Sequence, residues 1–387
     1  MRIYLDYAAT TPVDPRVRDA MIPAFDSLFG NPSSIHRFGQ EASEAVELAR
    51  QNVASLLGSD SQNIIFTSGG SEADNAAIKG VGFAMRGRKN HIITSQIEHH
   101  AVLHTCRFME SLGFSVTYLP VDSNGLVDPS AVQSAITDKT CLITVMHANN
   151  ELGTIQPIEE IGQIAHQRGV LFHTDAVQTC GHLPIDVDRM HIDLLSLSAH
   201  KFNGPKGVGA LYLRHGTPFE SFMHGGAQES GRRSSTHNVP GIIGLGRAAE
   251  IAAQEMKDEN QAIGRLRDRL WEGVRRNTEG IHLNGHPSQR LANNLNFSVE
   301  NVEGEALLMH LDMEGIAAST GSACSSGSTD PSHVLLALNL PRDLARGSLR
   351  LTLGRFTTEE DIDRTIETVR QAIAHLRSLA PARKETT

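Results

Sequence analysis

Apolar and polar residues follow two periods along the chain, one typical of helices and one typical of short buried strands. Apolar side chains recur at every third or fourth position over residues 41–57, which predicts a helix with Gly58 as its C-cap. Short apolar runs followed by polar or glycine-rich residues predict strands at 63–68, 91–95, 141–147, 170–175, 194–198 and 208–213. Because buried strands separated by helical stretches form βαβ units, we expect an α/β fold with a mostly parallel sheet.

The pattern changes in the C-terminal third of the chain. A long polar helix is predicted around residues 246–277, and it leads to runs at 293–299 and 348–355 that alternate as half-buried strands. The last helix is marked by Thr357 and Glu360, which are spaced as in a capping box, and by one apolar stripe behind them.

Length and composition indicate a globular protein of two domains. A chain of 387 residues exceeds what one ordinary core supports, and 40% hydrophobic with 20% charged residues is typical of folded proteins. We expect a large domain over residues 15–255. Residues 1–14 and 256–387 would form a smaller domain.

Charge and hydropathy exclude several classes of partner. The net charge is -9, from 35 basic and 44 acidic residues, which argues against a dedicated nucleic-acid binder. No apolar run approaches the ~20 residues that span a bilayer, and the first residues, MRIYLDYAATTP, do not resemble an export signal. We therefore expect a cytoplasmic protein with no nucleic-acid or membrane partner.

The four cysteines differ in their surroundings. They form no CxxC pair and do not have the spacing of a zinc site. Cys106, Cys141 and Cys180 lie among periodic or apolar residues, so we expect them to be small buried hydrophobes. Cys324 lies instead in a small, polar stretch over residues 320–329, which predicts a loop. An exposed loop cysteine is prone to oxidation and is a liability unless it is used.

A helix is predicted directly after this loop, with Asp330 as its N-cap and Pro331 as its first residue.

The first predicted strand leads into a glycine-rich turn. Gly69-Gly70-Ser71 is followed by Asp74, and Ser71 is expected to cap the next helix. A turn of this kind at a helix N-terminus is a ready site for a phosphate. It matches neither a dinucleotide-binding motif nor a P-loop, and an ordinary capped turn explains it equally well when it is taken alone.

The residues after the other strands have simple structural explanations one by one. His99 could be an interior histidine, Asn150 a turn residue, Asp175 a helix cap and Lys201 a solvated lysine. In a parallel sheet, however, the carboxyl ends of the strands meet at one edge, where ligands bind.

Taken together, these residues indicate pyridoxal phosphate. Lys201 can form a Schiff base with an aldehyde cofactor, and Asp175 can keep a pyridine nitrogen protonated, so that the ring accepts electrons. The glycine-rich turn and Ser198 can hold a phosphate, and His99 can stack on the ring.

The chain resembles the NifS/IscS-type cysteine desulfurases of the class V aminotransferase superfamily over nearly its whole length. The matching segments are YLDYAATTPVDPRV, FGNPSSIH, FTSGGSEADN, IEHHAV, HANNELGTIQPI, HTDAVQ, SLSAHKFNGPKGVGALY, GSACSSG and LRLTLGRFTTEED. The resemblance implies a fold-type I pyridoxal-phosphate enzyme. Its large domain would contain a mostly parallel seven-stranded sheet flanked by helices, and a smaller α+β domain would carry the Cys324 loop.

The resemblance also implies roles for individual residues. Lys201 would bind the cofactor covalently, Asp175 would pair with the pyridine nitrogen and Gln178 with the ring hydroxyl. His99 would stack on the ring and shuttle protons. The phosphate would be held by Gly70, Ser71, Ser198 and His200, and by Thr236 of the other subunit of a homodimer.

The expected reaction converts L-cysteine to L-alanine. Asn150 and Arg350 would bind the substrate carboxylate, and Cys324 would accept the sulfur as a persulfide. The length of the Cys324 loop resembles the long-loop branch of the family. The persulfide would then pass to an iron–sulfur cluster scaffold or another acceptor protein. No metal site of its own is expected, although Cys324 could transiently ligate a cluster shared with a scaffold.

Two positions depart from the family pattern. Ser71 stands where many relatives have Thr, which also supplies a hydroxyl. Arg233-Ser234-Ser235 precedes Thr236, where relatives often have a Gly directly before the Thr.

Other functions remain open from the sequence. A selenocysteine lyase or a class V aminotransferase would keep Lys201 and Asp175, but neither explains Cys324 as well. A sulfur-relay protein that only docks a cluster scaffold would not need Lys201.

Overall fold

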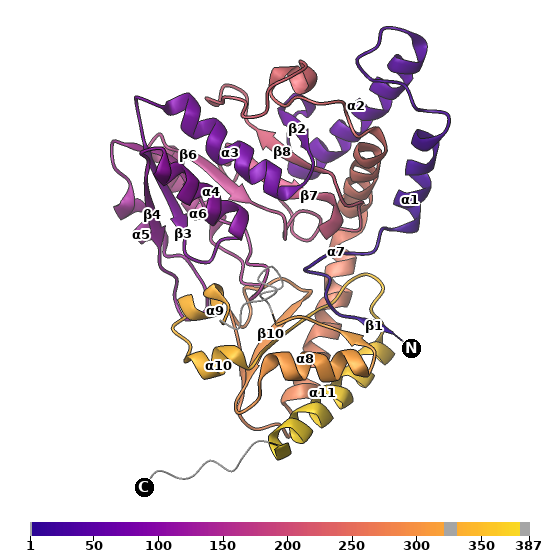
Figure 1. Cartoon of the computed structure of the whole chain (residues 1–387), viewed down its shortest axis with the longest axis vertical. Helices are drawn as coiled ribbons and strands as arrows, with labels where there is room; N and C mark the ends of the chain where they lie inside the picture. The colour runs from indigo at the N-terminus through magenta and orange to yellow at the C-terminus, as the bar shows by residue number, and fades with distance from the viewer. Residues whose placement is uncertain (1, 321–330, 380–387) are drawn as a thin grey trace.

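The computed structural model describes residues 2–320 and 331–379, and its largest element is a seven-stranded sheet (Figure 1). The order is β2-β8-β7-β6-β5-β3-β4. Strand β8 pairs antiparallel with β2 and β7, and the other neighbours pair parallel. The strands are β2 Ile64–Thr67, β3 His91–Ser95, β4 Ser115–Leu119, β5 Thr140–Thr144, β6 Leu171–Asp175, β7 Leu194–Ser198 and β8 Gly209–Leu213. The predicted α/β fold with a mostly parallel sheet is confirmed.

The six runs predicted in this part of the chain all contain strands of the large sheet, and one strand of that sheet, β4, was missed. Strand β4 lies at the edge of the sheet, and only Leu119 among its five residues is buried. An edge strand of this kind lacks the continuous apolar run that identifies its neighbours.

Helices cover both faces of the sheet, and neighbouring residues of one strand face different cores. Ile64 and Phe66 pack into a core with α2 and α7, whereas Ile65 packs into another with α3 and α4. The helices around the sheet are α1 Pro15–Met21, α2 Arg37–Leu57, α3 Gly70–Met85, α4 His100–Ser111, α5 Pro129–Ala135, α6 Ile158–Gln167 and α7 Val239–Arg275. Gly58 caps α2 in the left-handed conformation, as predicted. The predicted burial of Cys106, Cys141 and Cys180 is also confirmed.

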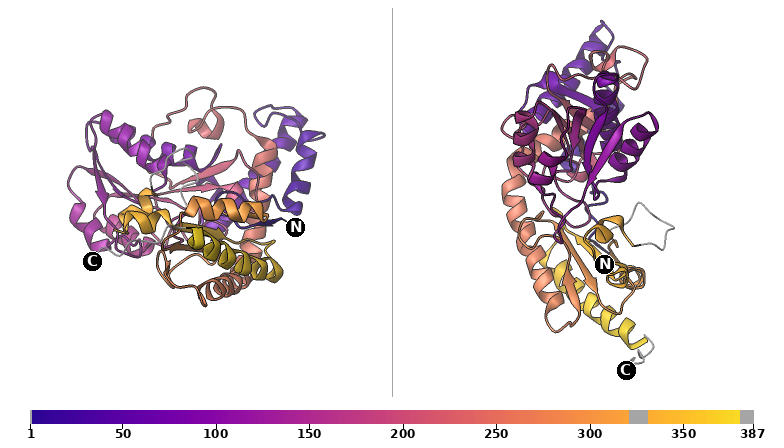
Figure 2. Two further views of the ribbon diagram at one scale, coloured as in Figure 1. Left: turned by 60° about the horizontal axis from the view of Figure 1, so that its bottom comes forward. Right: turned by 90° about the vertical axis from the view of Figure 1, so that its left-hand side faces the viewer.

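Helix α7 runs along one side of the molecule and past both sheets, as the right-hand view of Figure 2 shows. Its first part, up to Ala252, joins the core of the large sheet, and Ile263, Leu270 and Val274 join a second core. The helix begins at Val239, seven residues before the predicted start, where the side chain of Asn238 caps it.

The second core surrounds a three-stranded antiparallel sheet of order β12-β10-β9. Its elements are β9 Ile281–Leu283, β10 Asn294–Val299, β12 Ser348–Thr352, α8 Gly304–Met313 and α11 Glu359–Leu379. Strand β1 (Ile3–Tyr4) pairs beside this core with β11 (Ile316–Ala317). The first residues of the chain thus pack with the last third. The domain boundaries drawn from the sequence stay a prediction.

The runs at 293–299 and 348–355 were predicted to be half-buried strands. That prediction was wrong, because every residue of the strands they contain, β10 and β12, is buried. The alternating polar side chains face other polar groups of the protein and not solvent. Asn296 donates to the carbonyl of Glu151, and Asn284 donates to Asn296 and Ser298. Buried polar groups are tolerated when they are paired in this way.

Three predicted helix starts were also wrong in detail. In α3, Gly69 and not Ser71 is the N-cap residue, and Glu72 reaches back to the amide of Ser68. The short helix α9 (His333–Ala337) is capped by Ser332 and does not start at Pro331. Asp330 lies outside the described residues.

The capping box of α11 lies one residue later than predicted. Thr358 and Asp361 exchange hydrogen bonds between side chain and backbone amide in both directions. The short helix α10 spans Arg342–Arg346. Within residues 2–320 and 331–379, no helix has both the length and the apolar composition needed to cross a bilayer.

The packing of α7 against α2 leads to a first prediction. A Cβ atom added at Gly246 would lie 2.4 Å from Cα and 2.5 Å from Cβ of Ala49, so Gly246→Ala must push two helices apart. We expect it to lower the free energy of unfolding by about 1–3 kcal/mol, measured by urea unfolding. Gly264→Ala in the same helix is the matched control, because its Cβ would meet only Ala292 at 3.8 Å. That change should stabilise the protein by roughly 0.5–1 kcal/mol. Equal effects of the two substitutions would contradict this packing.

Candidate active site

A cavity of about 470 Å³ lies at the carboxyl ends of the parallel strands. Ten residues predicted for the cofactor or substrate line it, namely Gly70, Ser71, His99, Asn150, Asp175, Gln178, Ser198, His200, Lys201 and Arg350. Ala8, Ala9, Asp74, Met146, Ala148 and Val177 complete the lining. The cavity therefore lies where ligands are expected to bind in a parallel sheet, beyond the carboxyl ends of its strands.

Lys201 ends a short 3-10 turn, Ala199–Lys201, that directly follows β7. Its Nζ donates hydrogen bonds to the carbonyl oxygens of Ala8 and Ala9, each at 2.7 Å. The same N-terminal segment is tied to the turn by the amide of Thr11, which donates to His200. The amine is thus held in the cavity by backbone from the start of the chain. Sequence reasoning missed Ala8 and Ala9, because only their carbonyl groups take part.

Asp175 is the last residue of β6 and is only 6% exposed. The amide of Val177 donates to its Oδ1 at 2.9 Å. Burial raises the pKa of Asp175 to about 6, although this amide and the Lys201 ammonium favour the charged form. A carboxyl so placed can face a cationic ring nitrogen.

The N-terminus of α3 contributes Gly70 and Ser71 to the lining of the cavity. A Cβ at Gly70 would lie 2.6 Å from Cγ2 of Val177, so glycine lets the helix start approach the strand ends closely. Ser198 ends β7 beside this turn, with its Oγ 3.8 Å from the place a Cβ on Gly69 would take. Free amides, the helix dipole and nearby hydroxyls suit a phosphate.

His99 caps α4, and its Nδ1 accepts a hydrogen bond from the amide of Ala101. The neutral ring therefore carries its proton on Nε2. Burial, assisted by the charge of Lys201, lowers the pKa of His99 to about 4. Burial also lowers the pKa of His200 to about 4, and its Nδ1 lies 3.1 Å from the hydroxyl of Thr10. Both imidazoles are neutral near pH 7.

Arg350 enters the cavity from β12 of the second core and is 2% exposed. It donates from Nη1 to the carbonyl of Asn150 at 3.0 Å and from Nη2 to Oδ1 of Asp6 at 2.8 Å. Its Nε is buried and has no hydrogen-bond partner among the described residues. A buried guanidinium with an unused donor suits a small carboxylate.

The remaining predicted residues are placed differently. Gln178 lies in the cavity and donates from Nε2 to the carbonyl of Ala8 at 3.0 Å. Thr236 is exposed and does not line the cavity. Cys324 lies outside the described residues. Among the residues that the structure describes, no group of three or more His, Cys, Asp or Glu side chains could hold a metal ion.

Sequence reasoning missed Asp74 as a residue of the site and took it for part of a capped turn. It follows Gly70 by four residues on α3, so both face the same side of the helix and both line the cavity. That spacing was visible in the sequence.

The sequence-family model of the class V aminotransferases matches residues 3–365 of this chain. The cysteine desulfurase IscS of Dictyoglomus turgidum is 54% identical to this chain over 383 residues, which cover 99% of this chain and 97% of the relative. The chain belongs to the class V aminotransferases, among the IscS-type cysteine desulfurases. The predicted family is thereby confirmed.

Solved structures of relatives agree with this assignment and with the predicted fold-type I architecture. A NifS-like protein has a TM-score of 0.91 at 40% identity, and the match covers 97% of this chain and 100% of its own. A structure of SspA in complex with cysteine has a TM-score of 0.83 at 40% identity, and covers 92% of this chain and 100% of its own.

Class V aminotransferases of the cysteine desulfurase type use pyridoxal phosphate, which confirms the predicted cofactor. The residues of the cavity fit it. Lys201 supplies an amine and Asp175 a buried carboxyl. Any side chain at Gly70 would collide with Val177, so glycine is needed where the start of α3 lines the cavity.

The buried glutamate that precedes His99 in the sequence leads to a second prediction. Glu98 is fully buried, accepts from Ser95 and from the amide of Met146, and burial raises its pKa to about 8. A raised pKa means that folding takes up a proton here. The resulting stability is present below the unfolded pKa of about 4.5 and is lost as the pH rises through 8.

Glu98→Gln mimics the neutral acid, so its urea midpoint relative to wild type should rise between about pH 5.5 and pH 8.5. The exposed Glu360→Gln serves as control and should show no such trend. A constant difference between Glu98→Gln and wild type over this range would show that Glu98 is ionised throughout.

Proposed function

We propose that the protein converts L-cysteine to L-alanine and carries the released sulfur as a persulfide on Cys324. The observation that carries this proposal is the meeting of Lys201, Asp175 and the N-terminus of α3 in one cavity of a chain from this family. The relative solved in complex with cysteine supports the choice of substrate.

The cofactor would be held from three sides of the cavity. Asp175 would pair with the pyridine nitrogen, Gln178 with the ring hydroxyl, and His99 would stack on the ring. The phosphate would lie at the start of α3, against Gly70, Ser71, Ser198 and His200. When bound, pyridoxal phosphate would supply an aldehyde that can bond to the amine of Lys201 or of the substrate, and a ring that can accept the electrons left by proton removal.

The protein groups orient the substrate and move its protons. Arg350, with Asn150, would bind the substrate carboxylate and so fix the direction of the Cα–H bond. Lys201, once exchanged, is an amine within the cavity and would remove the Cα proton. His99 is neutral and carries a proton on Nε2, so it would exchange a proton with the substrate sulfur or with Cys324.

Sulfur transfer balances without an outside oxidant. The Cys324 thiolate attacks the substrate sulfur, an S–S bond forms, and the Cβ–S bond breaks, as in thiol–disulfide exchange. The electron pair of the broken bond stays with the carbon fragment, which takes up protons and leaves as alanine. L-Cysteine and a thiol thus become L-alanine and a persulfide.

The persulfide must be consumed by another protein. Its outer sulfur is reactive, so an acceptor with a thiol would take it, and we propose an iron–sulfur cluster scaffold or another sulfur-transfer protein. Because the thiol of Cys324 must stay reduced between turnovers, we place this chemistry in the cytoplasm.

We further propose a homodimer in which Thr236 of each chain reaches the phosphate of the other. Exposed apolar side chains suit a subunit interface, and five gather in one segment: Ile22, Phe25, Phe29, Ile35 and Phe38. Thr236 is exposed on its own subunit, although the segment that carries it is firmly held.

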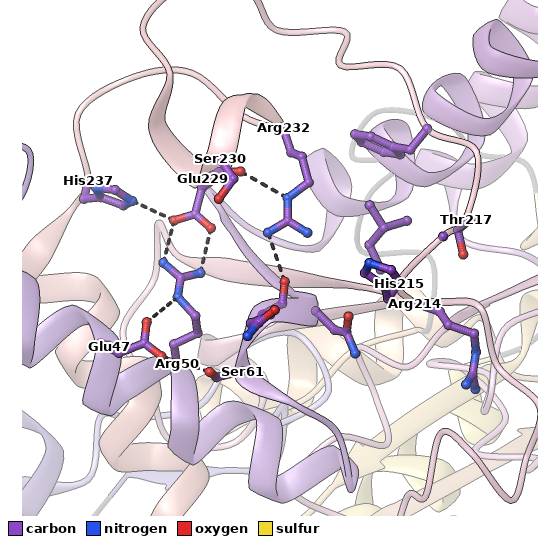
Figure 3. A pocket seen from close by; sticks show the side chains of 15 residues that line it. Glu47, Arg50, Ser61, Arg214, His215, Thr217, Glu229, Ser230, Arg232 and His237 are labelled. Carbon is purple, nitrogen blue, oxygen red and sulfur yellow. Dashed lines mark hydrogen bonds and ion pairs between the residues drawn. The ribbon is translucent and has the colours of Figure 1, made fainter.

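Glu229 anchors this segment, as Figure 3 shows. Its carboxylate is 1% exposed and accepts two bonds from Arg50, at 2.7 and 3.0 Å, and one from the amide of Phe66. His237, next to Thr236, lies 2.6 Å from the same carboxylate. The segment is therefore fixed to α2 and to the outer edge of β2.

The first test of this function concerns Cys324. Cys324→Ser should bind pyridoxal phosphate and change its visible spectrum when L-cysteine is added, because the cofactor residues lie elsewhere in the chain. It should form no persulfide and release alanine at least about 100-fold more slowly, because a hydroxyl cannot accept sulfur. Ser325→Ala, at the next position in the sequence, is the matched control.

Lys201→Ala should lose the covalent bond to the cofactor, so that borohydride traps no cofactor on the protein, and it should also form no persulfide. Trapping on another lysine would refute the cofactor assignment. Wild-type rates of alanine and sulfide formation by Cys324→Ser would refute the persulfide mechanism.

The second test concerns the dimer. Thr236→Val and Glu229→Gln should each weaken pyridoxal-phosphate binding about 10- to 100-fold, the cost of one lost hydrogen bond to a charged group. Titration of the cofactor-free protein measures this. Glu47→Gln is the control, because Glu47 pairs with the same Arg50 and accepts its other hydrogen bond from Ser61, which lies outside the Thr236 segment. A fully active monomer in sedimentation would refute the shared site.

A further inference from the structure

A second carboxyl lies in the cavity beside Asp175, and the proposed reaction gives it no role. Asp74 is on α3, is 1% exposed and lines the same cavity. The negative charge of Asp175 acts on Asp74. Since two buried carboxylates repel each other strongly, the pair holds one proton more readily than none.

The hydrogen bonds around Asp74 indicate which carboxyl carries that proton. Its Oδ1 has no hydrogen-bond partner among the described residues, and Nε2 of His173 lies 3.8 Å away. That nitrogen is 3.0 Å from the hydroxyl of Ser196, and Nδ1 of the same ring is 2.7 Å from Thr144. A buried carboxylate oxygen without a donor is costly, whereas a protonated one brings its own donor.

The charged groups around the pair favour the same assignment. The negative charges of Asp175 and Glu98 act on Asp74, and the hydroxyl of Ser196 only partly offsets them. His173 gives no positive charge, because burial lowers its pKa to about 3. Asp175 has the amide of Val177 and the ammonium of Lys201 in its favour. Burial, together with the negative charges of Asp175 and Glu98, holds the pKa of Asp74 well above its usual range.

We propose that Asp74 is a positioning residue that holds the proton of the Asp74–Asp175 pair, so that Asp175 stays ionised toward the pyridine nitrogen. This role rests on the proposed function of Asp175. A neutral Asp74 leaves a single negative charge on the cavity floor, which matches a single ring cation. Two ionised aspartates would place two negative charges against one ring cation. A proton on Asp175 would remove the carboxylate that the ring nitrogen needs as its partner.

Infrared spectroscopy of the cofactor-loaded protein near pH 7 reports the proton directly. A buried protonated carboxyl has a carbonyl band that a carboxylate lacks. We expect Asp74→Asn to lose one such band and Asp175→Asn to keep it. Glu98→Gln is the control, because it should remove a different band. Labelling wild type with 13C-carboxyl aspartate should shift the Asp74 band even if a variant does not fold.

The pH dependence of cofactor affinity is a second readout. The dissociation constant of pyridoxal phosphate should rise as Asp175 gains a proton, and this midpoint should stay in place in Asp74→Asn, because one neutral group replaces another. If Asp74 were ionised, its removal would lower the midpoint by about one pH unit or more.

The outcomes distinguish a failure of the role of Asp74 from a failure of the proposed function of Asp175. A lowered midpoint, or a band that survives Asp74→Asn and disappears in Asp175→Asn, overturns the role of Asp74 alone. If Asp175→Asn keeps wild-type cofactor affinity and turnover, the proposed function of Asp175 fails and the role of Asp74 falls with it.

Discussion

The parallel hydrogen bonding between β6 and β7 is the constraint on which the site depends. It pairs Asp175 with Ser196, so the carboxyl at the end of one strand lies beside the turn that carries Lys201. A slip of one residue would send the side chain of Asp175 to the opposite face of the sheet, away from the cavity. Such a slip is unfavourable because helices cover both faces and apolar residues alternate between two cores. The burial that stabilises the sheet therefore also sets the distance between acid and amine.

The first residues of the chain connect this sheet to the second core. Strand β1 pairs with β11, Asp6 forms an ion pair with Arg350, and the carbonyls of Ala8 and Ala9 accept hydrogen bonds from Lys201. The substrate side of the cavity and the cofactor side thus belong to segments far apart in sequence. Polar strand residues facing the large sheet are paired across this junction, for example Asn296 with Glu151. Because these bonds are buried, relative movement of the two parts would leave polar groups unpaired.

Much of this arrangement could be predicted from the sequence, for an identifiable reason. Buried parallel strands are apolar on both faces, so their ends are sharply marked. Asp175 is the last residue of one such strand, and Lys201 ends the short turn that follows another. Strand β4 was missed because it is exposed, and the burial of β10 and β12 was misjudged because their polar faces are paired inside the protein. Ala8 and Ala9 act through backbone carbonyls, which no side-chain pattern reveals. Asp74 was overlooked because it was judged by its nearness to a turn and not by its helical face.

The distribution of charge explains why a site of this kind resists prediction from local pattern. Asp74, Glu98, Glu151 and Asp175 are all buried near the cavity, and burial raises the pKa of each. Lys201 and Arg350 are the cations that act on these acids from within the cavity lining, and Arg350 already pairs with Asp6. Buried acids that hold a proton, as proposed for Asp74, avoid the cost of a buried charge, and the proton turns a repelling charge into a hydrogen-bond donor. The protonation states of these buried acids therefore set the charge that a cationic, phosphorylated ring would meet in the cavity. These depend on the whole surroundings of a side chain, while residue type and spacing record only its position.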